Sequence, residues 1–210
     1  MEKSLVYLVG QDGSAIPAEL WDDISAEHVE LWTKGWQPEI NKMVERLKQD
    51  GVPREKWPQD LHWDWRKKAD LTRGYLAYQR FTLICERQLQ GLMLVNLTSA
   101  TARLDVQRGK DMAYVDFVST APWNRPDFLK AGKPRFVGVG SVMIRVAVEL
   151  SRAEGFRGRI GLHSLPQAER FYRKTCQMTD LGPDTAYYGL TYFEMTETQA
   201  NAFITEPPRK

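Results

Sequence analysis

Cysteine and histidine are scarce in this chain. Among its 210 residues only Cys85 and Cys176 are cysteines, and only three are histidines. Two cysteines are too few for a disulfide framework in a chain of this length, so a reducing, cytoplasmic location is expected. The cysteines and histidines also lack the spacing of zinc ligands, so no metal site is expected.

Long hydrophobic runs and an excess of one charge are also missing. The apolar run near the N-terminus, from Leu5 to Val9, is too short for a signal-peptide core or a membrane span. The 29 basic side chains nearly balance the 27 acidic ones, which leaves a net charge of +2. Such a balance attracts polyanions only weakly, so neither nucleic acid nor a membrane is expected as a partner.

The composition that remains is that of a globular protein with one substantial core. Hydrophobic residues make up 42% of the chain and charged residues 27%. Without repeats, low-complexity tracts or an evident linker, residues 1–200 are predicted to form a single domain, and residues 201–210 a tail. Within this domain, residues 18–70 and 75–195 have different patterns.

The first of these regions is predicted to be helical. It follows a strand at Leu5–Val9 that is closed by a turn at Gln11–Gly13. Ser25 is a candidate N-cap for one helix, and a second helix after Pro38 is predicted to end at Gly51. The stretch WPQDLHWDWRKKADL predicts a third helical segment, beginning at Trp57.

From Tyr75 onward, strand-forming residues dominate. Three strands within 75–86, 91–105 and 112–120, joined by short links, predict an antiparallel meander. A helix is then predicted from Gly140 to Gly155, and a short strand follows at 159–163. Ser164 and Gln167 have the spacing of a capping box for a further helix, and two strands are expected near 178–181 and 187–195.

The stretch RFVGVGS, residues 135–141, places two glycines at the start of an apolar helix. Unpaired N–H groups and the positive end of the helix dipole make such a position suited to binding a phosphate group, with Arg135 as an additional cation. The stretch is not a P-loop, because no lysine precedes Ser141, and not a Rossmann loop, because Met143 stands where a third small residue is needed. A tight turn without a ligand is the alternative.

The spacing Arg135-x-x-Gly138-x-Gly140 resembles the pyrophosphate-binding motif of the GNAT superfamily of acyl-CoA-dependent N-acyltransferases. The segment from Ala168 to Phe171 and Tyr172 resembles a second signature of that superfamily. The resemblance covers residues 75–195 and implies an α/β fold. A mixed, mostly antiparallel sheet of six to seven strands would be flanked by helices, and the helices within 18–70 would form an enlarged acceptor-side region.

The resemblance further implies an N-acetyltransferase that moves an acetyl group from acetyl-CoA directly to a primary amine in a ternary complex. Tyr172 would protonate the leaving thiolate, and Asp116 is a candidate base. The cofactor-binding residues implied are Thr120, Arg135, Phe136, Val137, Gly138, Val139, Gly140 and Ser141. The acceptor would be a small-molecule amine or a protein or peptide amine, and a homodimer is allowed.

Several alternatives stay open. Leu165 stands where the superfamily has an asparagine, and TCQM replaces its usual Gly-Phe, so a CoA-binding or non-catalytic regulatory protein of the same fold is the second hypothesis. His163 or a water chain could serve as the base in place of Asp116. Trp57, Trp63, Trp65 and His62 could line a pocket for an apolar or aromatic amine, or simply pack the helical region.

Overall fold

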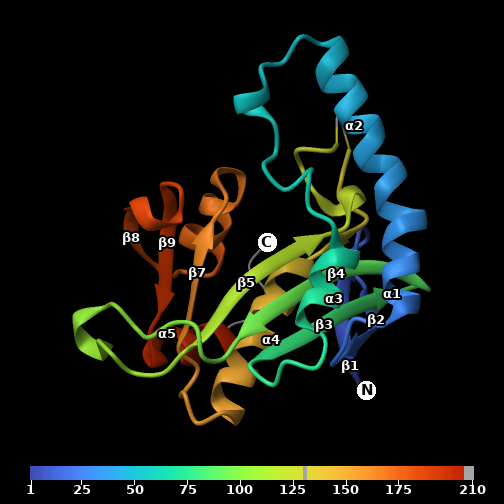
Figure 1. Ribbon diagram of the computed structural model, residues 1–210. Helices are drawn as coiled ribbons and strands as arrows, with labels where there is room; N and C mark the ends of the chain where they lie inside the picture. The colour runs from blue at the N-terminus through green and yellow to red at the C-terminus, as the bar shows by residue number, and fades with distance from the viewer. Residues whose placement is uncertain (130–131, 206–210) are drawn as a thin grey trace. The chain divides into compact units, whose positions relative to one another are not determined.

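Nine strands form one mixed sheet in the computed structural model, which describes residues 1–129 and 132–205 (Figure 1). The sheet order is β6-β1-β2-β3-β4-β5-β7-β9-β8. The strands are β1 (Lys3–Gly10), β2 (Ala15–Trp21), β3 (Tyr78–Cys85), β4 (Gln88–Asn96), β5 (Ala113–Thr120), β6 (Phe136–Val137), β7 (Ile160–Ser164), β8 (Thr179–Asp184) and β9 (Leu190–Met195).

The predicted fold class is confirmed, but the predicted count of six to seven strands is wrong. The β5–β7 pair is parallel, whereas β1–β2, β2–β3, β1–β6, β7–β9 and β8–β9 are antiparallel. Strands β2 and β6 were not foreseen. Pro17 in β2 argues against a central strand, but β2 pairs with β3 only from Ala18 onward, so the missing N–H of Pro17 breaks no bond of that ladder.

The chain forms two compact units. The first consists of residues 1–74, 80–92 and 119–139, and the second of residues 75–79, 93–118 and 140–210, of which 140–205 are described. Strands β3, β4 and β5 each contribute residues to both units. Within the described residues, no helix is long and apolar enough to cross a membrane.

The helices of the first unit are α1 (Ala26–Leu31), α2 (Gln37–Gln49) and α3 (Trp65–Thr72). Ser25 caps α1 as predicted, because its hydroxyl accepts a hydrogen bond from the His28 N–H at 3.2 Å. A π-helical turn, Trp32–Trp36, joins α1 to α2, and the two follow each other along one rod in Figure 1. The third helix begins at Trp65 rather than at Trp57, because the Asp64 carboxylate caps it there by accepting from the Lys67 N–H.

The second unit contains most of α4 (Val139–Ala153) and all of α5 (Glu197–Thr205). Helix α4 buries Met143, Ile144 and Ala147 completely, as its apolar pattern requires. The predicted capping box at Ser164 is wrong, since the Ser164 hydroxyl donates to the Leu165 carbonyl and a 3-10 turn, Pro166–Ala168, follows. Residues 201–205, predicted as a tail, complete α5, and residues 206–210 lie outside the described residues.

Candidate functional site

Gly138 has a backbone conformation that suits glycine. Its φ angle is +87°, a region that residues with a side chain rarely adopt, and a Cβ at this position would meet no atom within 4 Å. Helix α4 begins at the next residue, Val139, so the first N–H groups of the helix have no partner within it. The turn is therefore open beside Gly138 and leads directly into the first turn of α4.

Gly140 differs from Gly138 in that it lies close to another segment of the chain. A Cβ on Gly140 would lie 3.1 Å from Cζ of Phe171, which is tighter than ordinary van der Waals contact. Phe171 begins the π-helical segment Phe171–Thr175. The second glycine of the motif thus allows this segment to pack closely on the start of α4.

Two of the predicted phosphate-binding residues are already engaged within the first unit. The Arg135 guanidinium pairs with the Glu86 carboxylate at 2.6 Å and donates to the Gln88 side chain at 2.5 Å. The Phe136 N–H donates to the Asn124 side chain at 2.9 Å. The donors that remain for an anion are therefore concentrated in the backbone from Gly138 to Ser141.

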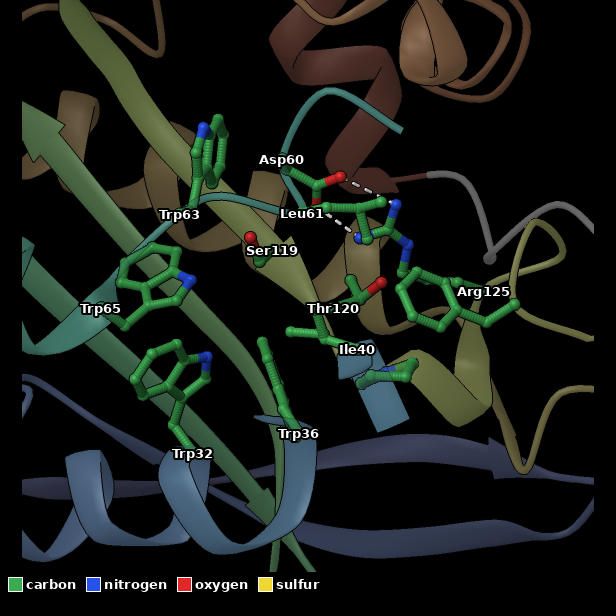
Figure 2. A pocket seen from close by; sticks show the side chains of 12 residues that line it. Trp32, Trp36, Ile40, Asp60, Leu61, Trp63, Trp65, Ser119, Thr120 and Arg125 are labelled. Carbon is green, nitrogen blue, oxygen red and sulfur yellow. Dashed lines mark hydrogen bonds and ion pairs between the residues drawn. The ribbon is translucent and has the colours of Figure 1, made fainter. Parts of the chain in front are cut away.

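Thr120, one of the predicted cofactor-binding residues, is the last residue of β5. Thr120 and its buried neighbour Ser119 line a pocket that lies entirely within the first unit (Figure 2). Four of the residues that line this pocket are tryptophans: Trp32, Trp36, Trp63 and Trp65. The other lining residues are Ile40, Asp60, Leu61, Pro122, Arg125 and Phe128. The pocket is thus predominantly aromatic and apolar.

An ion pair closes one side of this aromatic pocket. The Arg125 guanidinium makes a bidentate pair with the Asp60 carboxylate and also contacts Asp127 at 2.6 Å (Figure 2). The hydrogen bonds to these two carboxylates raise the pKa of Arg125 despite its burial, so the guanidinium stays charged. Its planar group also stacks 4.7 Å from the ring centroid of Phe128.

Asp116, the predicted base, lies on β5 in the second unit and is half-buried. The phenol of Tyr78 forms a hydrogen bond with the Asp116 carboxylate, and burial together with this bond raises the pKa of Tyr78. A phenol that keeps its proton acts as a donor, so Tyr78 orients the carboxylate. Asp116 belongs to β5, the strand that ends at Thr120.

Tyr172, the predicted acid, is buried in the second unit, in the π-helical segment after Gly140. Its ring packs against Phe171 and Phe193, with centroid separations of 5.2 and 5.8 Å. Burial raises the pKa of the phenol, so the hydroxyl keeps its proton at neutral pH. Within residues 1–129 and 132–205 this hydroxyl has no hydrogen-bond partner.

His163, the alternative base, belongs to a network in the second unit. Its Nδ1 lies 2.6 Å from the Tyr114 hydroxyl and its Nε2 lies 3.0 Å from an Asp184 carboxylate oxygen. Contacts with Arg103 and with His163 hold the pKa of Asp184 at about 2, whereas burial lowers the pKa of His163. The ionised carboxylate can only accept, so we assign the His163 proton to Nε2 and the accepting lone pair to Nδ1.

The aromatic ring of Tyr187 covers this network. It stacks on the His163 imidazole at a centroid distance of 3.7 Å and an interplanar angle of 9°. Both imidazole nitrogens are engaged and the ring is covered, so His163 is less suited than Asp116 to take a proton from a substrate. Among the described residues, no group of three His, Cys, Asp or Glu side chains could hold a metal ion.

The predicted site residues are divided between the two units. Thr120 and residues 135–139 belong to the first unit, whereas Asp116, Gly140, Ser141 and Tyr172 belong to the second. Trp63 and Trp65 were predicted as candidates to line a pocket, but Trp32 and Trp36, which line the same pocket from the turn between α1 and α2, were not. Trp57 and His62 do not line it, and the indole N–H of Trp57 donates to the Val52 carbonyl instead.

No protein-family model and no curated protein sequence matches this chain. The GNAT domain of S. lividans PAT matches in structure with a TM-score of 0.51 at 14% identity, covering 92% of this chain and 96% of that domain. A structure described as a GNAT-family acetyltransferase from Desulfovibrio desulfuricans matches with a TM-score of 0.50 at 12% identity, covering 84% of this chain and 96% of that one.

A crystal structure of a bacterial toxin matches with a TM-score of 0.50 at 12% identity, over 72% of this chain and 83% of the toxin. Matches at identities this low establish a similarity of fold alone. The chain has the fold of the GNAT acetyltransferases, as the two glycines and the Tyr172 segment predicted.

Proposed function

We propose that this protein is an acyl-CoA-dependent N-acyltransferase that transfers an acetyl group from acetyl-CoA to a primary amine in a ternary complex. The observation that carries the proposal is the turn at Gly138, which has a φ angle of +87° and directly precedes α4. This protein has both this turn and the fold of the GNAT acetyltransferases. The hydroxyl of Tyr172, which lacks a partner among the described residues, supports it further.

The residues from Gly138 to Ser141 fit a pyrophosphate group. Their N–H groups open α4, where the helix dipole favours negative charge, and no atom would contact a Cβ at Gly138. The Arg135 side chain adds positive charge nearby in the sequence, although Glu86 partly neutralises it. When bound, acetyl-CoA supplies an activated thioester.

The chain's own residues then account for the proton balance. Amide formation breaks a carbon–sulfur bond and forms a carbon–nitrogen bond, so the amine must lose a proton and the sulfur must gain one. The Asp116 carboxylate, oriented by Tyr78, takes the proton from the amine. The Tyr172 hydroxyl donates a proton to the sulfur, and the N–H of Thr120 at the end of β5 polarises the carbonyl oxygen.

Calorimetry with CoA and with pantetheine, which lacks the pyrophosphate, tests the cofactor site. Several charge-assisted hydrogen bonds from α4 predict that CoA binds at least roughly 100-fold more tightly. Val137→Glu adds a negative charge at an exposed position next to Gly138 and should weaken CoA binding about tenfold. Leu76→Glu, which adds the same charge at another exposed position, is the matched control.

Equal affinities for CoA and pantetheine would place the binding energy elsewhere and contradict the proposed cofactor site. Tight CoA binding without transfer to any amine would instead support the alternative of a CoA-binding protein without catalytic activity.

A further inference from the structure

The side-chain amide of Gln90 is completely buried in the first unit, and all of its hydrogen-bonding groups are engaged. Its Nε2 donates to the carbonyls of Cys85 and Gln88, at 3.3 and 3.1 Å. Its Oε1 accepts from the Trp123 indole and from the Asn124 side chain, both at 2.9 Å. Carbonyls only accept and an indole N–H only donates, so these partners determine which end of the amide faces which segment. Gln90 thus joins the β3–β4 hairpin to the residues that follow β5.

Asn124 extends this connection to the segment that enters the glycine turn. Its Nδ2 donates to Gln90, and its Oδ1 accepts from the backbone N–H of Phe136 at 2.9 Å. Phe136 belongs to β6, which lies at one end of the sheet and pairs only with β1. An edge strand has one side without a neighbouring strand, so N–H groups on that side need another acceptor. The Asn124 oxygen provides this acceptor two residues before Gly138.

The link between β5 and β6 comprises residues 121–135, of which 121–129 and 132–135 are described. The position of the far end of a long link is determined by its contacts, because the chain between its ends allows many paths. The Arg135 N–H donates to the Trp123 carbonyl at 3.2 Å, next to the bond between Asn124 and Phe136. The two ends of the link therefore meet at the residues that Gln90 holds.

The hairpin that carries Gln90 has a strained turn. Its two central residues, Glu86 and Arg87, have φ angles of +49° and +61°, where glycine or asparagine is usual. Such strain persists only where surrounding contacts maintain it. The carbonyls of Cys85 and Gln88, which flank the turn, are the two that accept from Gln90. The geometry of the turn and the position of the Gln90 amide therefore depend on each other.

This network ends at the backbone where the proposed function places the cofactor pyrophosphate. A single residue, Val137, separates Phe136 from Gly138, so a displacement of Phe136 also displaces the turn and the start of α4. Gln90 and Asn124 do not belong to the residues that would contact the phosphate groups. They can act on binding only through the backbone of Phe136. The following inference rests on the proposed function in this respect.

We propose that Gln90 and Asn124 are positioning residues for the cofactor site. Through Phe136 they hold the segment that enters the Gly138 turn in the position that binds the pyrophosphate. Their contribution concerns the pyrophosphate part of CoA, because pantetheine lacks the group that this segment binds.

Calorimetry of the full chain with CoA and with pantetheine tests this role. Asn124→Leu removes both hydrogen bonds at similar side-chain size, so CoA should bind roughly 10-fold more weakly and pantetheine within about twofold of the unmodified protein. Gln90→Met should weaken CoA roughly 3- to 10-fold, again without affecting pantetheine. Gln90 acts through Asn124, so the double variant should bind CoA no more weakly than Asn124→Leu alone.

Thr82→Val is the matched control for a loss of stability. The buried Thr82 hydroxyl donates to the Asp23 carbonyl at 2.7 Å, in the same unit but outside the network. Its removal should lower the free energy of unfolding and leave the ratio of the CoA and pantetheine affinities unchanged. A change in this ratio therefore separates positioning from a general loss of stability.

Hydrogen exchange at the Phe136 amide tests the network without any substitution in the cofactor segment. In the unmodified protein this N–H should exchange at least about 100-fold more slowly than in an unstructured chain. The protection should fall in Gln90→Met, although Gln90 does not contact Phe136. If a variant does not fold, exchange in the unmodified protein still decides.

An unprotected Phe136 amide in the unmodified protein would overturn the proposal. An unchanged ratio of CoA and pantetheine affinities in Asn124→Leu and Gln90→Met would overturn it as well, because the two residues would then support the fold alone. In both cases, tighter binding of CoA than of pantetheine by the unmodified protein would leave the proposed function intact. Equal affinities for CoA and pantetheine in the unmodified protein would contradict the proposed function and the positioning role together.

Discussion

A Cβ on Gly140 would lie 3.1 Å from the ring carbon Cζ of Phe171. The two glycines of the loop therefore have separate roles. Gly138 provides a left-handed backbone conformation, and Gly140 provides room for the segment that carries Tyr172. A motif that resembles a pure phosphate-binding signature thus also couples the start of α4 to the position of the proposed acid.

Gly140→Ala should be strongly coupled to Phe171→Leu. Alanine favours a helix by roughly 1 kcal/mol over glycine, but here its methyl group presses on the Phe171 ring. The single Gly140→Ala variant should therefore not be more stable than the unmodified protein. In the Phe171→Leu background, the same Gly140→Ala substitution should increase stability. Denaturant unfolding of the four proteins measures the interaction energy, which we expect to be about 1 kcal/mol or more.

Gly155→Ala, at a glycine that a Cβ would not crowd, serves as the comparison for the Phe171→Leu background. Its positive φ angle predicts a loss of stability that does not depend on residue 171. Additive effects of Gly140→Ala and Phe171→Leu would show that the close approach is not energetically important.

Tyr172→Phe should lower turnover roughly 100-fold or more, with the affinity for CoA unchanged. The hydroxyl has no partner among the described residues, so its removal breaks no hydrogen bond there and should barely change the melting temperature. Tyr192→Phe is the matched control. Its hydroxyl contacts the Glu194 carboxylate at 3.2 Å, so its loss should cost stability, about 1 kcal/mol, and spare turnover. Unchanged turnover in Tyr172→Phe would rule out the acid role.

Asp116→Asn should lower kcat at neutral pH far more than it raises KM for the amine. Asparagine can still accept the hydrogen bond from Tyr78, so the position is kept while the base is removed. The acidic limb of the pH–rate profile should disappear with it. Asp105→Asn, at an exposed acid of the same unit, should change neither quantity. A profile identical to that of the unmodified protein would exclude Asp116 from the reaction.

Stability should fall on acidification partly through His163. Burial lowers its pKa in the folded state, so the unfolded chain takes up this proton at a higher pH than the folded chain. The unfolding free energy must therefore decrease as the pH falls below about 6.5, by up to roughly 1.4 kcal/mol per pH unit. The titratable groups around the imidazole are Arg103, Tyr114, Asp184, Tyr187 and Tyr192.

Denaturant unfolding between pH 7 and pH 5 measures this dependence. His163→Asn should reduce the slope, although it also lowers stability overall by breaking two hydrogen bonds. His28, whose pKa burial also lowers, contributes a second and independent part of the slope, which His28→Gln should remove. An unchanged slope in His163→Asn would show that His163 does not contribute to the pH dependence of stability. Asp184, with a pKa of about 2, contributes only at lower pH, where stability is lost as its carboxylate is protonated.

The sequence was informative where a local pattern alone determines structure. Helix α2, the strands β3 and β5, and the glycine turn follow directly from apolar periodicity, strand formers and glycine placement. The spacing of a capping box did not by itself predict a capped helix. The pair Ser164 and Gln167 has the spacing of a capping box, but Pro166 directs the chain into a 3-10 turn. Thr196 and Gln199 have the same spacing and do exchange hydrogen bonds at the start of α5.

The pocket could be predicted only in part, because it depends on contacts between distant segments. Trp63 and Trp65 stand close together in the sequence and suggested a pocket, whereas Trp32 lies more than thirty positions earlier. The pairing of Arg125 with Asp60 and of His163 with Asp184 likewise joins residues that no local pattern relates. Such groups can be found only after the chain has folded.

A thiol-release assay with acetyl-CoA and a panel of primary amines, in which mass spectrometry identifies the product, tests whether this protein transfers an acetyl group. We expect release of CoA thiol that depends on the amine, with one acetylated amine formed for each thiol, and loss of most of this activity in Tyr172→Phe. CoA that binds without amine-dependent thiol release, across small amines, polyamines, peptides and aminoacyl-tRNA, would contradict this expectation.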